Sequence, residues 1–360
     1  MVDIAGGGLP YEVTIAPGAL DRLGDVVQKV APGNRCVVIA DLTVGELYGH
    51  RIAGLVGDPG YVMCVPMSEK AKTRELWASI TDDLLQNNYG RDTTLVAFGG
   101  GVTGDVAGFV AATYMRGIPY VQVPTSLLAM VDASVGGKTG VDTPHGKNLV
   151  GAFHQPAAVL IDPLLLDTLP VEHLRAGFAE IIKHGVVADA DYFDEVAGAV
   201  TAGVLRGTAD PERLTSLIRG SVAIKASVVA RDARESGLRK ILNFGHTIGH
   251  AAEAATNYEM LHGNAVAMGM VAEARIAEHL EIAQAGTAAR VESACREALL
   301  PVALPDVPIE SLISFTRADK KARGGRVEYA LPERIGAMAG AESGWAIPVD
   351  DDTIRDALAK

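Results

Sequence analysis

The chain is poor in the residues that mark several common classes of protein. Of its 360 residues only 3 are cysteine, and 5% are aromatic. Cys36, Cys64 and Cys295 are odd in number, widely spaced and flanked mostly by apolar residues. They therefore favour neither a disulfide scaffold nor a thiolate metal site, and we expect them to pack in the core.

Basic residues and long apolar runs are also scarce. The chain has 32 lysines and arginines against 44 aspartates and glutamates, which makes a net charge of -12. Since no basic run is long enough to follow a phosphate backbone, we expect no nucleic-acid partner. No stretch reaches the roughly eighteen apolar residues of a membrane span, and the first residues lack a secretion-signal pattern. We expect a cytoplasmic protein with no membrane partner.

Hydrophobic residues, by contrast, make up 48% of the chain, enough for a large buried core, and the length suits two domains. Up to about residue 165, short runs rich in valine and isoleucine alternate with helical patterns, as in a parallel α/β sheet. Residues 140–150 are rich in turn formers and predict a loop or an irregular hairpin. The expected strands are Tyr11–Ile15, Cys36–Ile39, Tyr61–Val65, Thr94–Phe98, Tyr120–Val123 and Ala158–Ile161.

The second half of the chain shows helical spacing almost throughout. The expected helices are Val171–Val187, Pro211–Arg234, Lys240–Asn257, Gly263–Ile282 and Thr287–Leu300, followed by a small β segment and a last helix at Asp351–Leu358. We therefore predict an α/β domain over residues 1–165 and a mostly α-helical domain over residues 166–360. A cleft between two such domains is a natural ligand site.

One stretch of the second half carries an unusual set of polar side chains. Glu235, Arg239, Asn243, His246 and His250 follow one another at steps of three or four residues, which would place them on one face of a continuous helix. Burying such groups without partners is costly, so we expect this face to line a polar cavity or a ligand. The alternative is a solvated face, which the apolar neighbours of these residues disfavour.

The same half contains possible metal ligands. Glu180 lies beside Lys183 on the predicted helix that opens the second domain. Two imidazoles and one carboxylate would suit zinc with an open fourth position, whereas the lack of an H-E-x-x-H motif disfavours a metalloprotease. The candidate histidines are His154, His184, His246, His250 and His262, and spacing alone does not choose among them.

Two glycine-rich stretches indicate phosphate binding. Gly99, Gly101 and Gly104 have G-x-G-x-x-G spacing between a predicted strand and a predicted helix, where backbone can approach a pyrophosphate. The match is weak by itself, because such turns also arise for steric reasons and this one follows several earlier strands. The second stretch, V-G-G-K-T-G, resembles the end of a nucleoside-triphosphate-binding loop, but Asp132 stands where that motif requires its first glycine.

Several further motifs are spread over nearly the whole chain. They are G-G-G-V-T-G-D-V-A-G-F, Y-M-R-G, P-T-S-L-L-A-M-V-D-A-S-V-G-G-K-T-G, G-K-N-L-V-G-A-F-H-Q-P, A-E-I-I-K-H-G, L-N-F-G-H-T-I-G-H-A, H-G-N-A-V and D-K-K. Taken together, these motifs resemble those of the 3-dehydroquinate synthases, in the sugar-phosphate cyclase family. The resemblance implies an N-terminal NAD-binding α/β domain of Rossmann-like, parallel-sheet type and a helical C-terminal metal-binding domain.

The resemblance implies NAD and zinc as cofactors, with cobalt able to replace zinc. Glu180, His246 and His262 would be the metal ligands. The residues implied to bind NAD, from the adenosine end through the pyrophosphate to the nicotinamide, are Ser68, Glu69, Lys72, Gly99, Gly100, Gly101, Gly104, Asp105, Thr125, Ser126, Lys138, Lys147, Leu165 and Thr168.

The substrate implied by the resemblance is a sugar phosphate, 3-deoxy-D-arabino-heptulosonate 7-phosphate. Arg116 would reach the phosphate bound by a neighbouring subunit, which implies a homodimer. Near the substrate, either Lys320 or the adjacent Lys321 could be the residue that faces the site. Asn264 stands where the family more often has glutamate, so we expect a modest change in charge beside the metal. The residues implied to surround the substrate are Asp132, Lys138, Lys147, Asn148, Lys183, Lys225, Arg239, Asn243, His250 and Lys320.

The implied reaction yields 3-dehydroquinate and phosphate, on the shikimate route. NAD oxidises the C5 hydroxyl, phosphate leaves by β-elimination, the hydride returns, and ring opening with an aldol closure completes the carbocycle. Three alternatives remain open at this stage. They are a sedoheptulose 7-phosphate cyclase such as 2-epi-5-epi-valiolone synthase, a metal-dependent polyol or glycerol dehydrogenase, and a binding protein without turnover.

Overall fold

The computed structural model describes residues 2–4, 11–57, 60–205, 211–319 and 327–358. The chain divides into two compact units, Met1–Leu169 and Pro170–Lys360. Lys320 and Lys321, both expected near the substrate, lie outside the described residues. Among the helices that are described, none combines the length and apolar character that crossing a bilayer requires.

The first unit is built on a seven-stranded sheet with the order β1-β2-β9-β6-β5-β3-β4. Strand β1 (Val2–Ile4) pairs antiparallel with β2, and the other described pairings in this sheet are parallel. The parallel α/β prediction is therefore confirmed, with every expected strand present. The parallel strands are β2 (Tyr11–Ile15), β3 (Arg35–Asp41), β4 (Tyr61–Val65), β5 (Thr93–Gly99), β6 (Tyr120–Pro124) and β9 (Ala158–Ile161).

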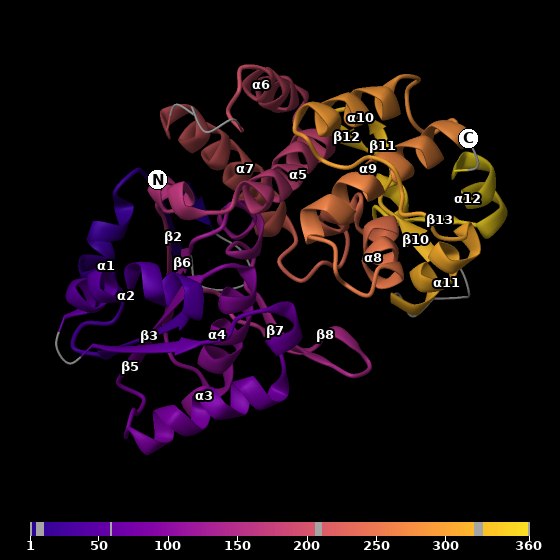
Figure 1. The fold of residues 1–360 in the computed structure, drawn as a ribbon. Coiled ribbons are helices and arrows are strands. Elements are labelled where there is room, and N and C mark those ends of the chain that lie inside the picture. Colours follow the sequence, from indigo (N-terminus) through magenta and orange to yellow (C-terminus); the bar gives the residue numbers. More distant parts are fainter. Residues whose placement is uncertain (1, 5–10, 58–59, 206–210, 320–326, 359–360) are drawn as a thin grey trace. The chain divides into compact units, whose positions relative to one another are not determined.

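Helices cover this sheet on both faces (Figure 1). The helices are α1 (Leu23–Val30), α2 (Leu42–Val56), α3 (Arg74–Gln86) and α4 (Gly101–Thr113). Leu95 and Ala97 of β5 pack with Ile80 of α3 and Val106 of α4 in one buried cluster. Burial on both faces explains why β5 reads as a continuous apolar run instead of an alternating one.

The sheet order locates the glycine-rich loop. The chain passes from β3 outward to β4 and then returns to place β5 on the other side of β3. In doubly wound sheets, ligands bind outside the carboxyl ends of the strands at such a switch point. The loop that follows β5 therefore occupies a binding position even though its strand does not open the sheet.

Residues near 140–150 form an antiparallel hairpin of β7 (Lys138–Thr143) and β8 (Gly146–Phe153). The pairing shifts register between Val141 and Thr143, as expected of an irregular hairpin. Asp142 accepts a hydrogen bond from the backbone N–H of Asn148 at 2.7 Å, which closes the turn.

The second unit is mainly helical, as predicted. Ile248, Ile276 and Ile354 pack with Tyr329 in a buried cluster that joins its helices to one of two small sheets. The helices are α5 (Val171–Ala188), α6 (Ala190–Thr201), α7 (Pro211–Arg231), α8 (His246–Ala255), α9 (His262–His279), α10 (Thr287–Glu297), α11 (Ile309–Asp319) and α12 (Asp351–Leu358). The sheets pair β10 (Val327–Tyr329) with β13 (Ile347–Val349) and β11 (Pro332–Arg334) with β12 (Ala337–Met338).

The prediction of one continuous helical face from Glu235 to His250 is wrong. A 3-10 helix covers Leu238–Asn243, and α8 begins only at His246. Gly245 separates the two with φ +80, a left-handed conformation that ends a helix. Before it, Glu235 itself has φ 58, in a turn whose backbone N–H groups bind Asp232. Glycine and a local carboxylate thus override the helical spacing.

Candidate active site

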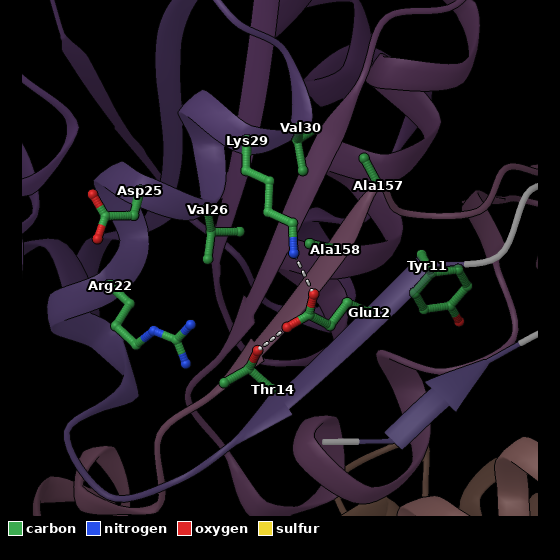
Figure 2. Close-up of a pocket in the computed structure, with 10 residues that line it drawn as sticks. All are labelled: Tyr11, Glu12, Thr14, Arg22, Asp25, Val26, Lys29, Val30, Ala157 and Ala158. Carbon is green, nitrogen blue, oxygen red and sulfur yellow. Dashed lines mark hydrogen bonds and ion pairs between the residues drawn. The ribbon is translucent and has the colours of Figure 1, made fainter.

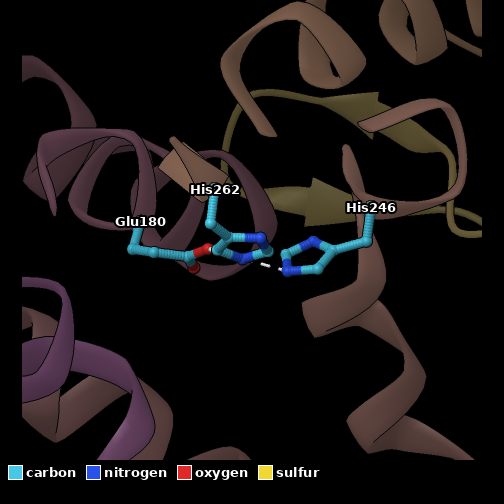
Figure 3. Close-up of side chains that lie close together, drawn as sticks. All are labelled: Glu180, His246 and His262. Carbon is cyan, nitrogen blue, oxygen red and sulfur yellow. Dashed lines mark ion pairs between the residues drawn. The ribbon is translucent and has the colours of Figure 1, made fainter. Parts of the chain in front are cut away.

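Three of the candidate ligands converge in the second unit. Nε2 of His246 and Nε2 of His262 lie 3.6 and 3.7 Å from Oε1 of Glu180. Figure 3 shows the two rings and the carboxylate end to end, carried by α5, α8 and α9. The two imidazole centroids are 5.3 Å apart. One ligand atom from each residue lies within 4.8 Å of the ligand atoms of the other two, close enough for all three to bind one metal ion.

The carboxylate of Glu180 has the environment of a metal ligand. Glu180 is fully buried, and neither of its oxygens accepts a hydrogen bond from the described residues. Lys183 forms an ion pair with Oε2, while Oε1 faces the two imidazoles at distances longer than a hydrogen bond. Two nitrogens and one carboxylate oxygen, with space between them, fit zinc with an open position.

The charges of the cluster perturb one another strongly. Burial by itself raises the pKa of Glu180, but Lys183, His262 and His246 outweigh it and hold that pKa well below its ordinary value. Burial and Lys183 hold the pKa of His246 well below its ordinary value. Burial opposes protonation of His262 as well, yet Glu180 and Glu253 raise its pKa to about 10. The carboxylates therefore create a place that attracts positive charge.

The other three candidate histidines lie in different surroundings. His250 lies within the imidazole group, its ring centroid 5.4 Å from that of His246. His184 is fully buried, and its Nδ1 is 2.6 Å from Oγ of Ser221, in keeping with a structural role. His154 belongs to the first unit, where it stacks on Tyr120 with ring centroids 5.4 Å apart. Spacing could not have made this distinction.

Buried cations accompany the metal group in the second unit. Lys183, Lys225 and Arg239 are exposed by only 1%, 6% and 3%, which is rare for charged side chains without a functional or structural task. The turn around Asp232 holds Arg239, whose Nη1 donates to the carbonyl of Ala233 at 2.8 Å. Its neighbour Asn243 donates to Oε1 of Glu235 at 2.7 Å.

Three buried or half-buried residues of the second unit were not found by sequence reasoning. Asp232 organises the turn before Arg239, and Glu253 and Glu273 contact the segments that carry the two candidate ligand histidines. One signal was present for Glu253, which follows His246 and His250 on the same helix face. Another was present for Glu273, a lone carboxylate in the apolar run of α9.

The glycine-rich loop of the first unit has the geometry of a phosphate cradle. An added Cβ at Gly99 would lie 2.8 Å from Cβ of Thr103, so packing alone favours glycine there, whereas at Gly104 it would meet the end of the Gln122 side chain, with Oε1 at 2.9 Å. At Gly100, by contrast, an added Cβ would meet only Oγ of Ser126, at 3.5 Å. Gly100 caps α4 without a side-chain hydrogen bond. The open space and the helix N–H groups fit a pyrophosphate.

A buried lysine links the loop to the hairpin. Lys72 is only 3% exposed, and its Nζ lies 2.5 Å from both Oδ2 of Asp105 and Oδ1 of Asn148. Nearby, Nζ of Lys147 pairs with Glu69 at 3.0 Å. The structure thus brings together residues that the resemblance assigned to both NAD and substrate.

The remaining predicted residues of the first unit are more scattered. The N–H of Thr125 donates to the carbonyl of Gly99 at 2.9 Å, which places Thr125 and Ser126 beside the loop. Thr168 lies 3.0 Å from the hydroxyl of Tyr48, and Leu165 is buried. The other predicted residues take separate positions: Ser68 caps a short 3-10 turn, Asp132 is half-buried, Lys138 is exposed at the start of β7, and Arg116 is exposed.

A separate cavity of about 340 Å³ lies between α1 and β2 (Figure 2). Lys29 and Thr14 both bind Glu12 within it, at 2.7 and 3.2 Å. Ala157 and Ala158 form part of its wall, and no predicted site residue lines it. Its lining belongs to the first unit, and none of the lining residues is a candidate metal ligand.

Fold and site together define a class: enzymes that combine a nucleotide-binding α/β unit with a helical unit carrying a Glu-His-His metal group. Two family models cover most of the chain, 3-dehydroquinate synthase N-terminal over residues 62–176 and 3-dehydroquinate synthase C-terminal over residues 177–322. A 3-dehydroquinate synthase from Nostoc sp. is 43% identical over 353 residues, 97% of this chain and 96% of that protein. The chain belongs to the 3-dehydroquinate synthase family.

Solved structures agree with this assignment. ValA, a 2-epi-5-epi-valiolone synthase from Streptomyces hygroscopicus with NAD+ and Zn2+ bound, superposes with a TM-score of 0.85 at 29% identity, covering 99% of this chain and 97% of that one. A 2-deoxy-scyllo-inosose synthase with carbaglucose-6-phosphate, NAD+ and Co2+ gives 0.87 at 26%, covering 99% and 98%. The expected fold class is thereby confirmed.

Proposed function

We propose that the chain converts 3-deoxy-D-arabino-heptulosonate 7-phosphate into 3-dehydroquinate and inorganic phosphate, with NAD and zinc as cofactors. The observation that carries the proposal is the convergence of Glu180, His246 and His262, in a chain of which 97% aligns with a member of this family. When bound, NAD accepts and returns a hydride, and zinc, or cobalt in its place, withdraws electron density from a substrate hydroxyl.

The second unit would supply the zinc ligands and most of the substrate contacts. Arg239 suits the substrate carboxylate, because its planar guanidinium can donate two parallel hydrogen bonds. Lys183 and Lys225, both buried, would bind phosphate and hydroxyl oxygens, and their burial strengthens such charge-assisted bonds. His250 and Asn243 would add hydrogen bonds.

The first unit would bind the dinucleotide. Its pyrophosphate would lie against Gly99, Gly100 and Gly101, where the N–H groups that begin α4 have no side-chain cap. Lys138 and Asn148 would donate to substrate oxygens, and Asp132 would accept from a substrate hydroxyl. These roles rest on the family motifs and on the residue types.

The alternative is a sedoheptulose 7-phosphate cyclase such as 2-epi-5-epi-valiolone synthase. Structural similarity to ValA is high, but its identity of 29% is well short of the 43% shared with the Nostoc 3-dehydroquinate synthase. The deciding experiment measures phosphate release from each of the two heptulose phosphates, with NAD and zinc present or removed. Release from heptulosonate phosphate only, dependent on both cofactors, is the expected result, and release from sedoheptulose phosphate only would favour the alternative.

The metal ligands have their own test. Glu180→Gln removes the charged ligand while keeping the shape of the side chain, so zinc content and turnover should be lost together. Metal analysis of the purified variant after dialysis measures the first, and phosphate release measures the second. Full zinc content in this variant would show that the ligand assignment is wrong.

We also propose that the enzyme is a cytoplasmic homodimer in which Arg116 reaches the phosphate bound by the neighbouring subunit. The exposure of Arg116 supports this, as does its unusual backbone, since Met115, Arg116 and Gly117 all have positive φ values, a conformation that clusters at functional sites. Mixing Arg116→Ala with Lys183→Ala subunits should restore activity if Arg116 acts across the dimer, because one site then has both groups. No restoration would place Arg116 in its own subunit's site.

A further inference from the structure

Both ligand histidines stand at the first residue of a helix. His246 begins α8, and His262 begins α9. The two helices pack closely, since an added Cβ at Gly269 of α9 would lie 2.8 Å from the backbone carbon of Gly245 and from the backbone nitrogen of Gly249. A side chain from each helix can therefore reach the start of the other.

A carboxylate of α8 reaches the start of α9. Oε1 of Glu253 lies 3.5 Å from Nδ1 of His262, whose Nε2 faces Glu180. Glu253 is only 3% exposed. A carboxylate beside Nδ1 favours the tautomer with its proton on that nitrogen, which leaves the lone pair of Nε2 for a metal.

A carboxylate of α9 reaches the start of α8. Glu273 is fully buried, and its two oxygens accept from the N–H groups of Gly245 and Ile248 at 2.7 and 2.9 Å. Gly245 has no side chain to cap the helix, so Glu273 does so in its place. It thereby fixes the turn in which Nδ1 of His246 donates to the carbonyl of Phe244 at 3.2 Å. That bond likewise leaves Nε2 of His246 for a metal.

We propose that Glu253 and Glu273 are reciprocal positioning residues of the zinc centre. Each lies on the helix begun by one ligand histidine and holds the histidine that begins the other helix. The inference rests on the proposed metal ligands. Partners of this kind change metal affinity by 10- to 100-fold when they are replaced.

The test uses Glu253→Gln and Glu273→Gln, with Glu278→Gln as a matched control. Glu278 also lies on α9 and caps a helix, accepting from the N–H of Ala288 at 3.0 Å at the start of α10. No predicted site residue lies on α10. Zinc affinity is measured by competition with a chromophoric chelator, and ligand geometry by the visible spectrum of the cobalt-substituted protein.

We expect zinc to bind roughly ten-fold or more weakly to each of the two variants, with an altered cobalt spectrum, while the control keeps native values for both. Native affinity and spectrum in folded Glu253→Gln would overturn the proposal, as would equal losses in the control. If Glu273→Gln does not fold, Glu273→Asp replaces it, with the same expectation because a shorter carboxylate cannot reach both N–H groups.

Failure of the proposed function would look different. An unmodified protein that binds zinc but releases no phosphate from heptulosonate phosphate would contradict the reaction and leave the positioning roles supported by the affinities. A Glu180→Gln protein with native zinc affinity would contradict the metal site itself, and with it this proposal.

Discussion

A close helix contact at the metal site depends on Gly263, and replacing this glycine gives a sharp prediction. Gly263 is the second residue of α9, directly after His262. An added Cβ there would lie 2.5 Å from the backbone carbon of Ala176 and 2.8 Å from its Cα. Ala176 lies one helical turn before Glu180 on α5, so Gly263→Ala should push His262 away from its fellow ligand.

The size of the effect follows from those distances. Carbon atoms in contact normally lie about 3.5–4.0 Å apart, so the start of α9 must move by about 1 Å. Overpacking of this kind costs about 1–3 kcal/mol, and the upper end applies because the obstacle is backbone. Alanine's better helix propensity returns about 1 kcal/mol, which leaves a net loss of about 2 kcal/mol. Since ligand sets tolerate only about 0.5 Å, zinc affinity should fall at least about ten-fold.

The assay compares urea unfolding and zinc affinity in Gly263→Ala and in Gly198→Ala. Gly198 lies within α6, and among the described residues no atom outside its own helix backbone comes within 4 Å of a Cβ added there. The control should therefore keep native zinc affinity and be as stable as the native protein, or more stable by up to about 1 kcal/mol. If Gly263→Ala matched the control in both measurements, the close approach of α9 to α5 would not hold His262 in place, and the reasoning would be refuted.

Three further predictions concern other parts of the molecule. Lys138→Ala should reduce phosphate release by at least about a hundred-fold and leave zinc content unchanged, because Lys138 lies in the first unit and is not a metal ligand; loss of zinc would contradict this. Gly100→Ala should weaken NAD binding, measured by calorimetry, by about ten-fold or more at unchanged stability. Gly99→Ala should in addition lower the free energy of unfolding, because the added Cβ would lie 2.8 Å from Cβ of Thr103. Backbone N–H groups of Ser236, Gly237 and Arg239 outweigh burial and lower the pKa of Asp232 to about 2. The stability that ionised Asp232 gives the folded protein is therefore complete above the pKa of this residue in the unfolded chain, and it is lost as the pH falls through about 2. Asp232→Asn should therefore lose about 1–2 kcal/mol of unfolding free energy near pH 7, allowing for partial exposure, and the difference from the native protein should shrink near pH 3.

Much of the fold was predictable because its signals are local. The six parallel strands are short runs rich in valine and isoleucine, and their positions were predicted to within one or two residues. Helices such as α5 and α12 were also predicted closely from apolar spacing. The order of the strands in the sheet could not be predicted in this way, since the pairing of β5 with β3 is a contact between segments that are distant in the sequence. That order is what explains the position of the glycine-rich loop.

Where the helical spacing misled, a local signal was present but was outweighed. The residues from Glu235 to His250 have the spacing of one helix face, yet Gly245 interrupts it and Asp232 binds the preceding turn. Within α8 the spacing of four residues does bring two imidazoles together, since the ring centroids of His246 and His250 lie 5.4 Å apart. The helical spacing therefore holds from His246 onward and fails before it.

By itself, the sequence determined the class of fold, the family and the residue types available for metal and phosphate binding. Local runs and motifs of consecutive residues carry that information. The family motifs already pointed to Glu180, His246 and His262, but only the tertiary structure shows that they meet, because they come from three helices that pack closely at glycines such as Gly263. It also revealed Glu253 and Glu273, since a carboxylate that holds the start of another helix is defined by packing between distant segments and by no pattern along the chain.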